Sequence, residues 1–347
     1  MKKRIYQIAI VLLFLACMLV GANNQNKKIE KKLGLKEQEL LTRTHDFSVQ
    51  NLKVDFVENP VGVDRTNPSF SWEMDNEGKN VKQYAYRIQV CMEDSGKAKD
   101  KQQMVWDSGY VQSSNATEVC YEGKALQSHT NYSYTVTCID EQLHYAVSQT
   151  ASFQTAYVNE QPFSHAKMIS MQGEENVYDE GQAIFIKEFV TDRKALKKAT
   201  IYATALGIYD AYINGERVGK DELKPGWSNY HESLYYNTYD ITELLVANHD
   251  TDDGIKAEST EDENIDSRGN QNRIAVMLGT GWWCGRVGFG TYDYHKPAFI
   301  ATIRLEYMDG SVEEIHTDEN WKYIKDTAVV SADIFNGELY DGSKITT

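Results

Sequence analysis

The sequence predicts an all-β protein made of two β-sandwich domains. Three observations carry this prediction. Apolar residues alternate with polar ones in many short segments. Asn-Gly, Asp-Gly and Asn-Pro pairs separate several of those segments. The composition includes 22 Tyr in 347 residues, which favours strands over helices. A chain of this length is sufficient for two or three domains with buried cores.

The first 22 residues read as a targeting segment. Residues 2–4 are basic, residues 8–20 are apolar, and residues 20–22 are small enough for a cleavage site. The apolar run is short for a membrane span. We therefore expect a cleaved signal peptide and a secreted or cell-surface protein of bacterial type. A lipoprotein modified at Cys17 and an uncleaved anchor are the less favoured alternatives. Residues 23–48 are polar and lysine-rich, which indicates a spacer.

The formal net charge of -15 argues against a nucleic-acid partner, since phosphate binding needs clustered cations. A neutral ligand fits an acidic protein better. No Cys-x-x-Cys or Cys/His spacing suggests zinc. Strand alternation places Cys91 outward and Cys138 inward, so we expect free thiols rather than a disulfide.

A first domain is expected over residues 49–157. Seven strands in about 105 residues is the immunoglobulin or fibronectin-III pattern. The Cys-Trp-Cys signature of true immunoglobulin domains is missing, which favours a fibronectin-III-like sandwich. The expected strands are Leu52–Phe56, Phe70–Glu73, Tyr84–Cys91, Val105–Asp107, Thr117–Tyr121, Tyr132–Ile139 and Ser148–Thr155.

A second domain, a jelly-roll-like sandwich, is expected over residues 165–347. Asn214-Gly215 and Asp309-Gly310 predict hairpin turns, and Asp240 begins a segment that could cap a short helical turn. Residues 248–272 are acidic and nearly free of apolar side chains, which predicts a solvated surface insertion; a calcium loop is the alternative. The expected strands are Ala183–Val190, Ala199–Leu206, Ile208–Ile213, Leu234–Tyr239, Arg273–Leu278, Ala298–Tyr307 and Val312–His316.

An ordered set of short motifs runs through about residues 50–347. The motifs include Pro60-Val61-Gly62-Val63-Asp64, Pro68-Ser69-Phe70-Ser71-Trp72, Trp106-Asp107-Ser108-Gly109, Tyr212-Ile213-Asn214-Gly215, Leu223-Lys224-Pro225-Gly226-Trp227, Leu278-Gly279-Thr280-Gly281-Trp282-Trp283 and Gly337-Glu338-Leu339-Tyr340-Asp341. Taken together, this set resembles the N-terminal, non-catalytic domains of the bacterial α-L-rhamnosidases. The sequence departs from the family's pattern where Gly342-Ser343 replaces Ala-Arg, and where Leu143-His144-Tyr145 replaces a usual Trp.

The resemblance implies a glycoside hydrolase whose catalytic (α/α)6 barrel would lie beyond the matched region. No segment of the 347 residues has the long amphipathic helices that such a barrel needs. We therefore assign no catalytic residues and expect the chain alone to lack activity. Glu338 and Asp341 could form a pair of acids, but a structural contact explains them better. We expect Glu338, Tyr340 and Asp341 to lie at a domain interface.

Sugar binding needs aromatic faces and a few groups that hydrogen-bond hydroxyls. For each aromatic candidate, packing in the core is the competing explanation, and turn chemistry alone explains Asn214. Asp221 and Glu222 are the best candidates for hydroxyl or calcium ligands, because some family members bind calcium. No other cofactor is expected, and no metal ligand is assigned. The candidates are Asn214, Asp221, Glu222, Trp227, Tyr230, Trp282, Trp283 and Arg286.

These observations lead to one hypothesis and two alternatives. The chain is expected to be the non-catalytic N-terminal portion of an exported α-L-rhamnosidase. It would bind or position rhamnose-containing oligo- or polysaccharides beside a catalytic domain or chain. The alternatives are an independent secreted carbohydrate-binding module and a structural remnant without a ligand.

Overall fold

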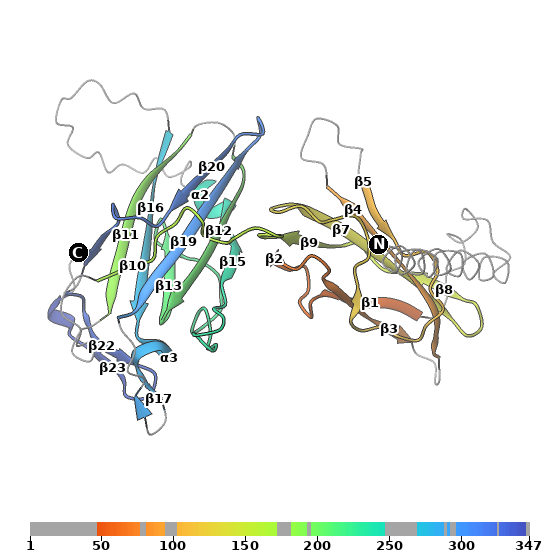
Figure 1. Ribbon diagram of the computed structural model, residues 1–347, viewed down its shortest axis with the longest axis horizontal. Coiled ribbons are helices and arrows are strands. Elements are labelled where there is room, and N and C mark those ends of the chain that lie inside the picture. Colours follow the sequence, from red (N-terminus) through yellow and green to blue (C-terminus); the bar gives the residue numbers. More distant parts are fainter. Residues whose placement is uncertain are drawn as a thin grey trace, which may run out of the picture. The chain divides into compact units, whose positions relative to one another are not determined.

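The computed structural model describes residues 47–76, 81–93, 103–171, 182–192, 196–246, 269–287, 290–291, 296–324 and 326–344. The expected signal peptide and nearly all of the expected spacer lie outside the described residues. The chain divides into two compact units, with the boundary between Glu160 and Gln161 (Figure 1). In the described part of the chain, no helix is long and apolar enough to cross a membrane. The predicted all-β fold is confirmed.

The first unit contains a three-stranded sheet in the order β1-β3-β6 and a larger sheet in the order β2-β9-β7-β4-β5, with β8 paired to β7. Every expected strand overlaps an observed one, and the short strands β2 and β8 are additional. The strands are β1 (Phe47–Val54), β2 (Val61–Val63), β3 (Ser69–Asn76), β4 (Gln83–Met92), β5 (Gln103–Asp107), β6 (Val119–Cys120), β7 (Asn131–Asp140), β8 (Tyr145–Val147) and β9 (Ala151–Thr155).

Strand β1 differs from the expectation at its end. It stops at Val54, and the next two residues, Asp55 and Phe56, turn the chain away with positive φ angles of 47° and 69°, outside the extended region of backbone conformations. The Phe56 side chain is therefore exposed instead of continuing the apolar face. The alternation that the sequence shows before Val54 does place Leu52 and Val54 in the core.

Aromatic rings fill the core of the first unit. Phe70 meets the ring of Tyr134 edge-on at 4.9 Å between centroids, and Tyr132 stacks on Phe153 at 5.0 Å. The Phe70–Tyr134 contact joins β3 of one sheet to β7 of the other, and Phe70 also meets Phe153 of β9 at 6.1 Å, so the Phe70 ring helps to close the sandwich.

An ion pair links β4 to β5 on the surface of the first unit. Arg87 Nε donates to Asp107 Oδ1 at 2.8 Å. Burial opposes the ionisation of Asp107, but hydrogen bonds from Arg87 and from the Gly109 N–H outweigh it and lower the pKa of Asp107. The pair therefore favours the folded state while Asp107 is ionised.

The cysteines of the described residues are unpaired, as expected. Cys91 is half-buried and Cys138 is buried, because the two lie on opposite faces of neighbouring strands β4 and β7. Burial raises the pKa of both Cys138 and Cys284 to about 12. These two thiols are therefore neutral and unreactive in the folded protein.

The second unit is a sandwich of two five-stranded sheets. One has the order β10-β19-β12-β15 with β20 paired to β19, and the other has the order β14-β13-β16-β11-β21. The strands are β10 (Ile169–Ser170), β11 (Ala183–Asp192), β12 (Leu196–Leu206), β13 (Ile208–Ile213), β14 (Glu216–Arg217), β15 (Asn237–Asp240), β16 (Gly269–Gly279), β19 (Ala298–Tyr307), β20 (Val312–His316) and β21 (Lys322–Ile324).

Smaller elements lie around this sandwich. Strands β17 and β18 form one two-stranded sheet, and β22 and β23 form another. The elements are α2 (Thr242–Val246), α3 (Gly281–Cys284), β17 (Arg286–Val287), β18 (Gly290–Thr291), β22 (Val329–Asp333), β23 (Gly337–Tyr340) and the 3-10 turn η4 (Gly342–Lys344).

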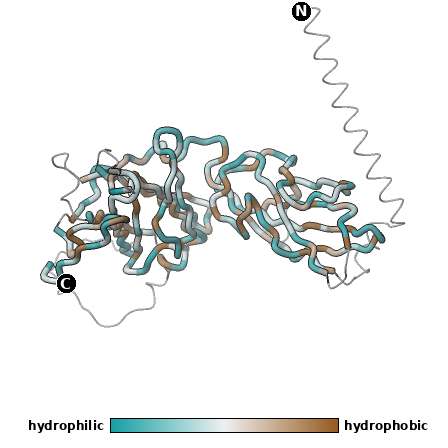
Figure 2. The backbone as a smooth tube through the Cα atoms, turned by 90° about the horizontal axis from the view of Figure 1, so that it is seen from below, coloured by the Kyte–Doolittle hydropathy of each residue, from teal (hydrophilic) through white to brown (hydrophobic). Residues whose placement is uncertain are grey.

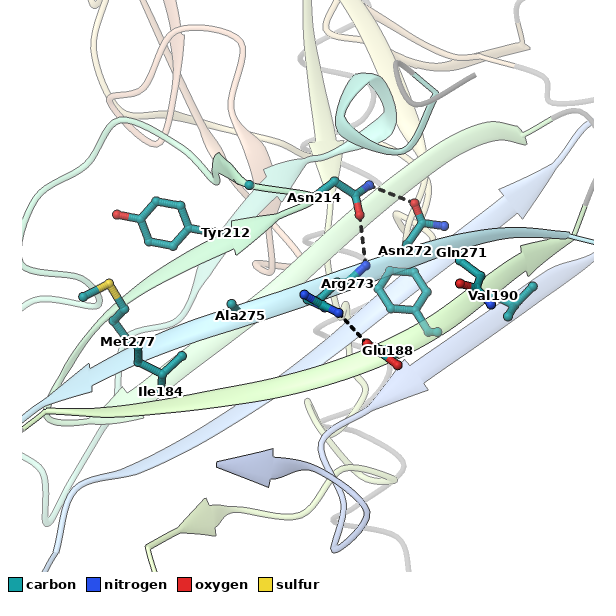
Figure 3. A pocket seen from close by; sticks show the side chains of 12 residues that line it. Ile184, Glu188, Val190, Tyr212, Asn214, Gln271, Asn272, Arg273, Ala275 and Met277 are labelled. Atoms are coloured by element: carbon teal, nitrogen blue, oxygen red, sulfur yellow. Dashed lines mark hydrogen bonds and ion pairs between the residues drawn. The ribbon is translucent and has the colours of Figure 1, made fainter. Parts of the chain in front are cut away.

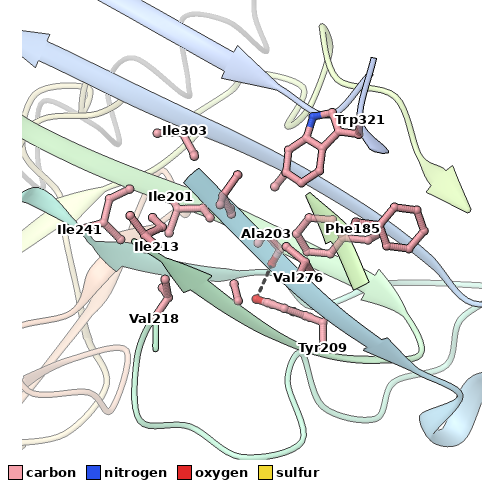
Figure 4. Close-up of a cluster of buried hydrophobic side chains, with 14 of the residues drawn as sticks. Phe185, Ile201, Ala203, Tyr209, Ile213, Val218, Ile241, Val276, Ile303 and Trp321 are labelled. Carbon is pink, nitrogen blue, oxygen red and sulfur yellow. Dashed lines mark hydrogen bonds between the residues drawn. The ribbon is translucent and has the colours of Figure 1, made fainter. Parts of the chain in front are cut away.

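The core of the second unit lies between its two sheets (Figure 4). Side chains from β11, β13 and β16 meet side chains from β12 and β19. Tyr209 and Phe299, one from each sheet, have ring centroids 5.2 Å apart. Hydrophobic and hydrophilic stretches are interspersed along the backbone (Figure 2). Buried positions alternate along β13, whereas Ala199–Ala205 of β12 are all buried.

The acidic insertion expected over 248–272 is shorter than the sequence suggested. Residues 269–272 belong to β16 and pair with β11, where Gly269 lies opposite Asp192 and Asn272 opposite Phe189. Asn272 is buried, and its amide donates to Thr191 Oγ1 at 3.1 Å. Residues 269–272 therefore form part of a strand because they pair with β11, although their polar sequence shows no apolar alternation. Residues 247–268 lie outside the described residues.

Candidate carbohydrate-binding site

Asp221 and Glu222 are held by other side chains of the protein. Arg217 Nη1 donates to Glu222 Oε1 at 2.9 Å, and Arg217 Nη2 donates to Asp210 Oδ1 at 2.8 Å. The Tyr239 hydroxyl donates to Asp221 Oδ2 at 2.6 Å. Both carboxylates thus have a structural role in fixing the chain after β14. Their role as sugar or calcium ligands stays a prediction.

The buried side chain of Lys224 contacts the same segment. Its side chain is 1% exposed, and Nζ donates to the Val218 carbonyl at 2.8 Å. Nζ also lies 3.2 Å from Asp210 Oδ1 and about 5.5 Å from the ring centroids of Tyr209 and Tyr239. The carbonyl, the carboxylate and the two aromatic faces around the buried ammonium offset the free-energy cost of removing its charge from water. The segment from Val218 to Lys224 is therefore fixed in one conformation.

The expected aromatic candidates differ in accessibility. Trp227 is 59% exposed. Trp282 and Trp283 lie on α3 and are half-buried, and neither belongs to the sandwich core. Trp283 meets Tyr230 edge-on at 5.3 Å and donates from Nε1 to the Lys296 carbonyl at 3.1 Å. Trp227 is therefore the candidate ring most open to a ligand.

Arg286 and the expected interface residues lie near the β22–β23 hairpin. The Arg286 backbone N–H donates to Asp333 Oδ2 at 2.7 Å, while its side chain is exposed. Glu338 and Tyr340 lie on β23, all of which is exposed. Asp341 instead turns toward its own backbone, where Oδ1 accepts from the Ser343 N–H at 3.0 Å. Asp341 thus stabilises the turn after β23.

A hollow of about 960 Å³ lies on the outer face of the sheet that contains β11, β13 and β16 (Figure 3). Of the eight residues that the sequence nominated for sugar binding, only Asn214 lines it. The lining residues are Ile184, Glu188, Phe189, Val190, Tyr212, Asn214, Gly215, Gln271, Asn272, Arg273, Ala275 and Met277.

Strand register creates the hollow. Tyr212 of β13 lies opposite Ala275 of β16, and the small alanine leaves space beside the tyrosine ring. Arg273 lies opposite Glu188 of β11, and Arg273 Nη2 donates to Glu188 Oε1 at 2.7 Å. The hollow therefore combines an aromatic side chain with a charge-neutral pair of hydrogen-bonding groups.

Asn214 supports the hollow by fixing the hairpin turn. Its Nδ2 donates to the Leu244 carbonyl at 3.0 Å and to Asn272 Oδ1 at 2.9 Å. Its Oδ1 accepts from the Arg273 N–H at 2.9 Å. Both ends of the amide are thus engaged with the protein. These contacts give Asn214 a structural role in the turn. The lining side chains with polar groups that could face a ligand are those of Tyr212, Arg273, Glu188 and Gln271.

The sequence interpretation did not select those four residues. Alternation along Ile208–Ile213 and Arg273–Leu278 already indicates that Tyr212 and Arg273 point away from the core, so this signal was present. Glu188 could not be found in this way, since its place beside Arg273 depends on the pairing of β11 with β16. Among the residues that the structure describes, no group of three or more His, Cys, Asp or Glu side chains could hold a metal ion.

The fold defines a class of protein built from two successive β-sandwich domains, of which the second has an open hollow on one sheet face. Residues 49–159 match the family model described as "Rha78A-like, N-terminal immunoglobulin domain". Residues 194–252 and 264–347 match "Alpha-L-rhamnosidase N-terminal domain". The chain therefore belongs to the α-L-rhamnosidase family, of which it carries two N-terminal domains.

Known relatives extend well past the matched region. An α-L-rhamnosidase of Formosa agariphila is 27% identical in an alignment 332 residues long, which covers 88% of this chain and 32% of that protein. The structure of the α-L-rhamnosidase from Dictyoglumus thermophilum has a TM-score of 0.70 and 30% identity, over 86% of this chain and 32% of that one. The native enzyme from Aspergillus terreus has a TM-score of 0.69 and 26% identity, over 86% and 32%. The chain thus spans about a third of these relatives.

Proposed function

We propose that this chain is the glycan-positioning N-terminal portion of an exported α-L-rhamnosidase, and that its second sandwich binds rhamnose-containing saccharides in the hollow. The observation that carries the proposal is the placement of Tyr212 beside the Arg273–Glu188 pair on one open sheet face. The family membership supports a rhamnose-containing ligand, because the relatives are α-L-rhamnosidases.

The chemistry of the hollow suits a neutral sugar. The C–H face of a sugar ring can lie on Tyr212, with Ala275 and Met277 supplying apolar contact. Arg273 uses one of its five N–H donors on Glu188, so further donors can reach hydroxyl oxygens while Glu188 accepts from hydroxyl groups. The two charges cancel, so the pair favours no net charge on the ligand. The volume lies within the range of about 300–1,000 Å³ usual for ligand sites.

Calorimetric titration tests this site. L-rhamnose and a rhamnose-containing oligosaccharide are titrated into the wild-type chain and into Tyr212→Ala and Arg273→Ala. We expect binding to the wild type and a loss of affinity of about tenfold or more in either variant, because each removes a central contact. Tyr235→Ala is the matched control, since Tyr235 is an exposed tyrosine outside the hollow. If wild type and Tyr212→Ala bind the sugar with the same heat and affinity, the proposed site is wrong.

Two further arms separate the alternatives. Trp227→Ala tests the loop that the sequence favoured; if this change alone abolishes binding, the sugar lies at that loop. Titrations with calcium and with a chelator test whether sugar binding depends on calcium. A wild-type chain that gives no heat at millimolar sugar contradicts glycan binding and leaves the structural-remnant alternative.

Export and the absence of independent catalysis complete the proposal. The basic, apolar and small segments of residues 1–22 support export. Mass spectrometry of the mature N-terminus should show cleavage after Ala22, whereas lipid on Cys17 would favour the lipoprotein alternative. The purified chain should not hydrolyse an aryl α-L-rhamnoside, and turnover at enzyme-like rates would overturn the non-catalytic assignment.

A further inference from the structure

The hollow is elongated along strand β16. Several of its lining residues are alternate positions of this one strand, so their side chains point to the same side of the sheet; they are Gln271, Arg273, Ala275 and Met277. The six residue steps from 271 to 277 span about 20 Å, at about 3.3 Å per residue. Strands β11 and β13 flank β16 and lie only about 4.8 Å to either side of it. The hollow is therefore roughly twice as long as it is wide.

The two ends of the hollow differ in chemistry. At one end Met277 lies opposite Ile184 of β11, and both side chains are half-buried. At the other end Gln271 lies opposite Val190, and both side chains are exposed. Figure 3 shows these two pairs at opposite ends of the hollow. We call them the apolar end (Met277 and Ile184) and the amide end (Gln271 and Val190).

Tyr212 and the Arg273–Glu188 pair lie between these ends. Tyr212 is opposite Ala275, beside the apolar end, whereas Arg273 is opposite Glu188, closer to the amide end. The side chains of Arg273 and Glu188 are 64% and 70% exposed, so both present hydrogen-bonding groups to solvent. Along β16 the hollow thus offers an aromatic side chain first and a polar surface after it.

One sugar residue does not fill this length. A pyranose ring extends over about two strand residues, or about 7 Å, which is roughly a third of the distance from the apolar end to the amide end. A ring stacked on Tyr212 therefore leaves the Arg273–Glu188 pair partly uncovered and does not reach Gln271. The polar half of the hollow has room for a second residue.

We infer that the hollow binds two or more consecutive residues of a saccharide chain that lies along β16, an inference that rests on the glycan binding proposed for the same hollow. The first residue stacks on Tyr212 and turns its apolar edge, which in rhamnose carries a methyl group, toward the apolar end. The next residue lies over the Arg273–Glu188 pair. Its hydroxyl groups also reach the Gln271 amide, which both donates and accepts hydrogen bonds.

The test compares chain lengths. L-rhamnose and its linear α-linked dimer and trimer are titrated calorimetrically into the wild-type chain and into Gln271→Ala, which changes only the amide end. Gln103→Ala is the matched control, because Gln103 is also an exposed glutamine on a strand, β5 of the first unit. Urea midpoints equal to that of wild type show that both variants are folded.

The trimer should bind the wild type at least about tenfold more tightly than L-rhamnose, a larger gain than repeated identical residues supply by their number alone. Gln271→Ala should weaken binding of the trimer about threefold or more and leave binding of L-rhamnose unchanged. The control variant should bind both sugars like wild type.

The alternative outcomes separate this inference from the proposed function. Equal affinities of the wild type for L-rhamnose and the trimer overturn the inference alone, since a site for one residue still binds glycan. An affinity of Gln271→Ala for the trimer equal to that of wild type overturns the placement of the chain along β16. A wild-type chain that binds none of the sugars overturns the proposed function and this inference with it.

Discussion

Replacing the buried ammonium of Lys224 should destabilise the second unit alone. In the folded chain Nζ bonds to the Val218 carbonyl, pairs with Asp210, and lies over the rings of Tyr209 and Tyr239. Lys224→Met keeps most of the apolar stem and removes the charged end. The substitution therefore measures what the polar contacts of Lys224 contribute to stability, while most of the apolar packing is kept.

The magnitude follows from what each group loses. A buried carbonyl left without its donor costs about 1–3 kcal/mol, and the lost cation–π contacts cost about 1–2 kcal/mol. Asp210 is not stranded, because Arg217 still donates to it and its side chain is 35% exposed. Removal of the desolvation cost of the ammonium offsets part of the loss. We expect a net loss of about 2 kcal/mol, and about 4 kcal/mol for Lys224→Ala, which adds a cavity.

Differential scanning calorimetry measures the effect. For a domain of 150–250 residues, about 2 kcal/mol lowers Tm by about 4–8 °C, and only the transition of the second unit should move. Lys167→Met is the matched control, since the Lys167–Glu319 pair is exposed on both sides and should leave the midpoint unchanged. A shift below about 1 °C for Lys224→Met, or a shift shared by both units, would refute the reasoning.

Three further outcomes are expected. Gly219→Ala should destabilise the second unit by about 1–3 kcal/mol in urea unfolding, because Gly219 has φ +72° and a Cβ there would lie 2.4 Å from the Tyr239 ring; an unchanged midpoint contradicts this. The first unit should lose stability in acid. Folding lowers the pKa of Asp107. Ionised Asp107 therefore contributes fully to the free energy of unfolding above its unfolded pKa of about 3.9, and this contribution is lost as the pH falls through its folded pKa. An Asp107→Asn variant that unfolds at the same acid midpoint as wild type would refute this expectation. Cys138 and Cys284, buried and with pKa values raised to about 12, should react with Ellman's reagent only after unfolding, and rapid reaction in the native protein would contradict their burial.

The sequence by itself determined the longer strands of both sandwiches, the hairpin turns and the family, but not shorter strands such as β10, β21 and β23. The expected strand Ala298–Tyr307 coincides with β19, and the Asn214-Gly215 turn has φ angles of 53° and 90°. The helical turn expected after Asp240 is α2, where Asp240 Oδ1 accepts from the Thr242 N–H at 2.9 Å. Each of these features depends on neighbours along the chain: alternation sets the buried face, and local φ preferences set the turns.

Only the tertiary structure decided which side chains are available to a ligand or a partner. Asp221 and Glu222 look free in the sequence, but Tyr239 and Arg217 engage them. Availability depends on register, burial and competing hydrogen bonds between distant segments, and one sequence does not encode these in any local pattern.

The hollow and the β22–β23 hairpin show the same dependence on tertiary structure. Arg273 and Glu188 are 85 residues apart in the chain and come together only because β16 pairs with β11. Phe335 and Leu339 have the composition of core residues, yet the hairpin that carries them lies outside both sandwich cores. Local pattern therefore fixed the longer strands, while the pairing of distant strands decided which side chains lie together on the surface.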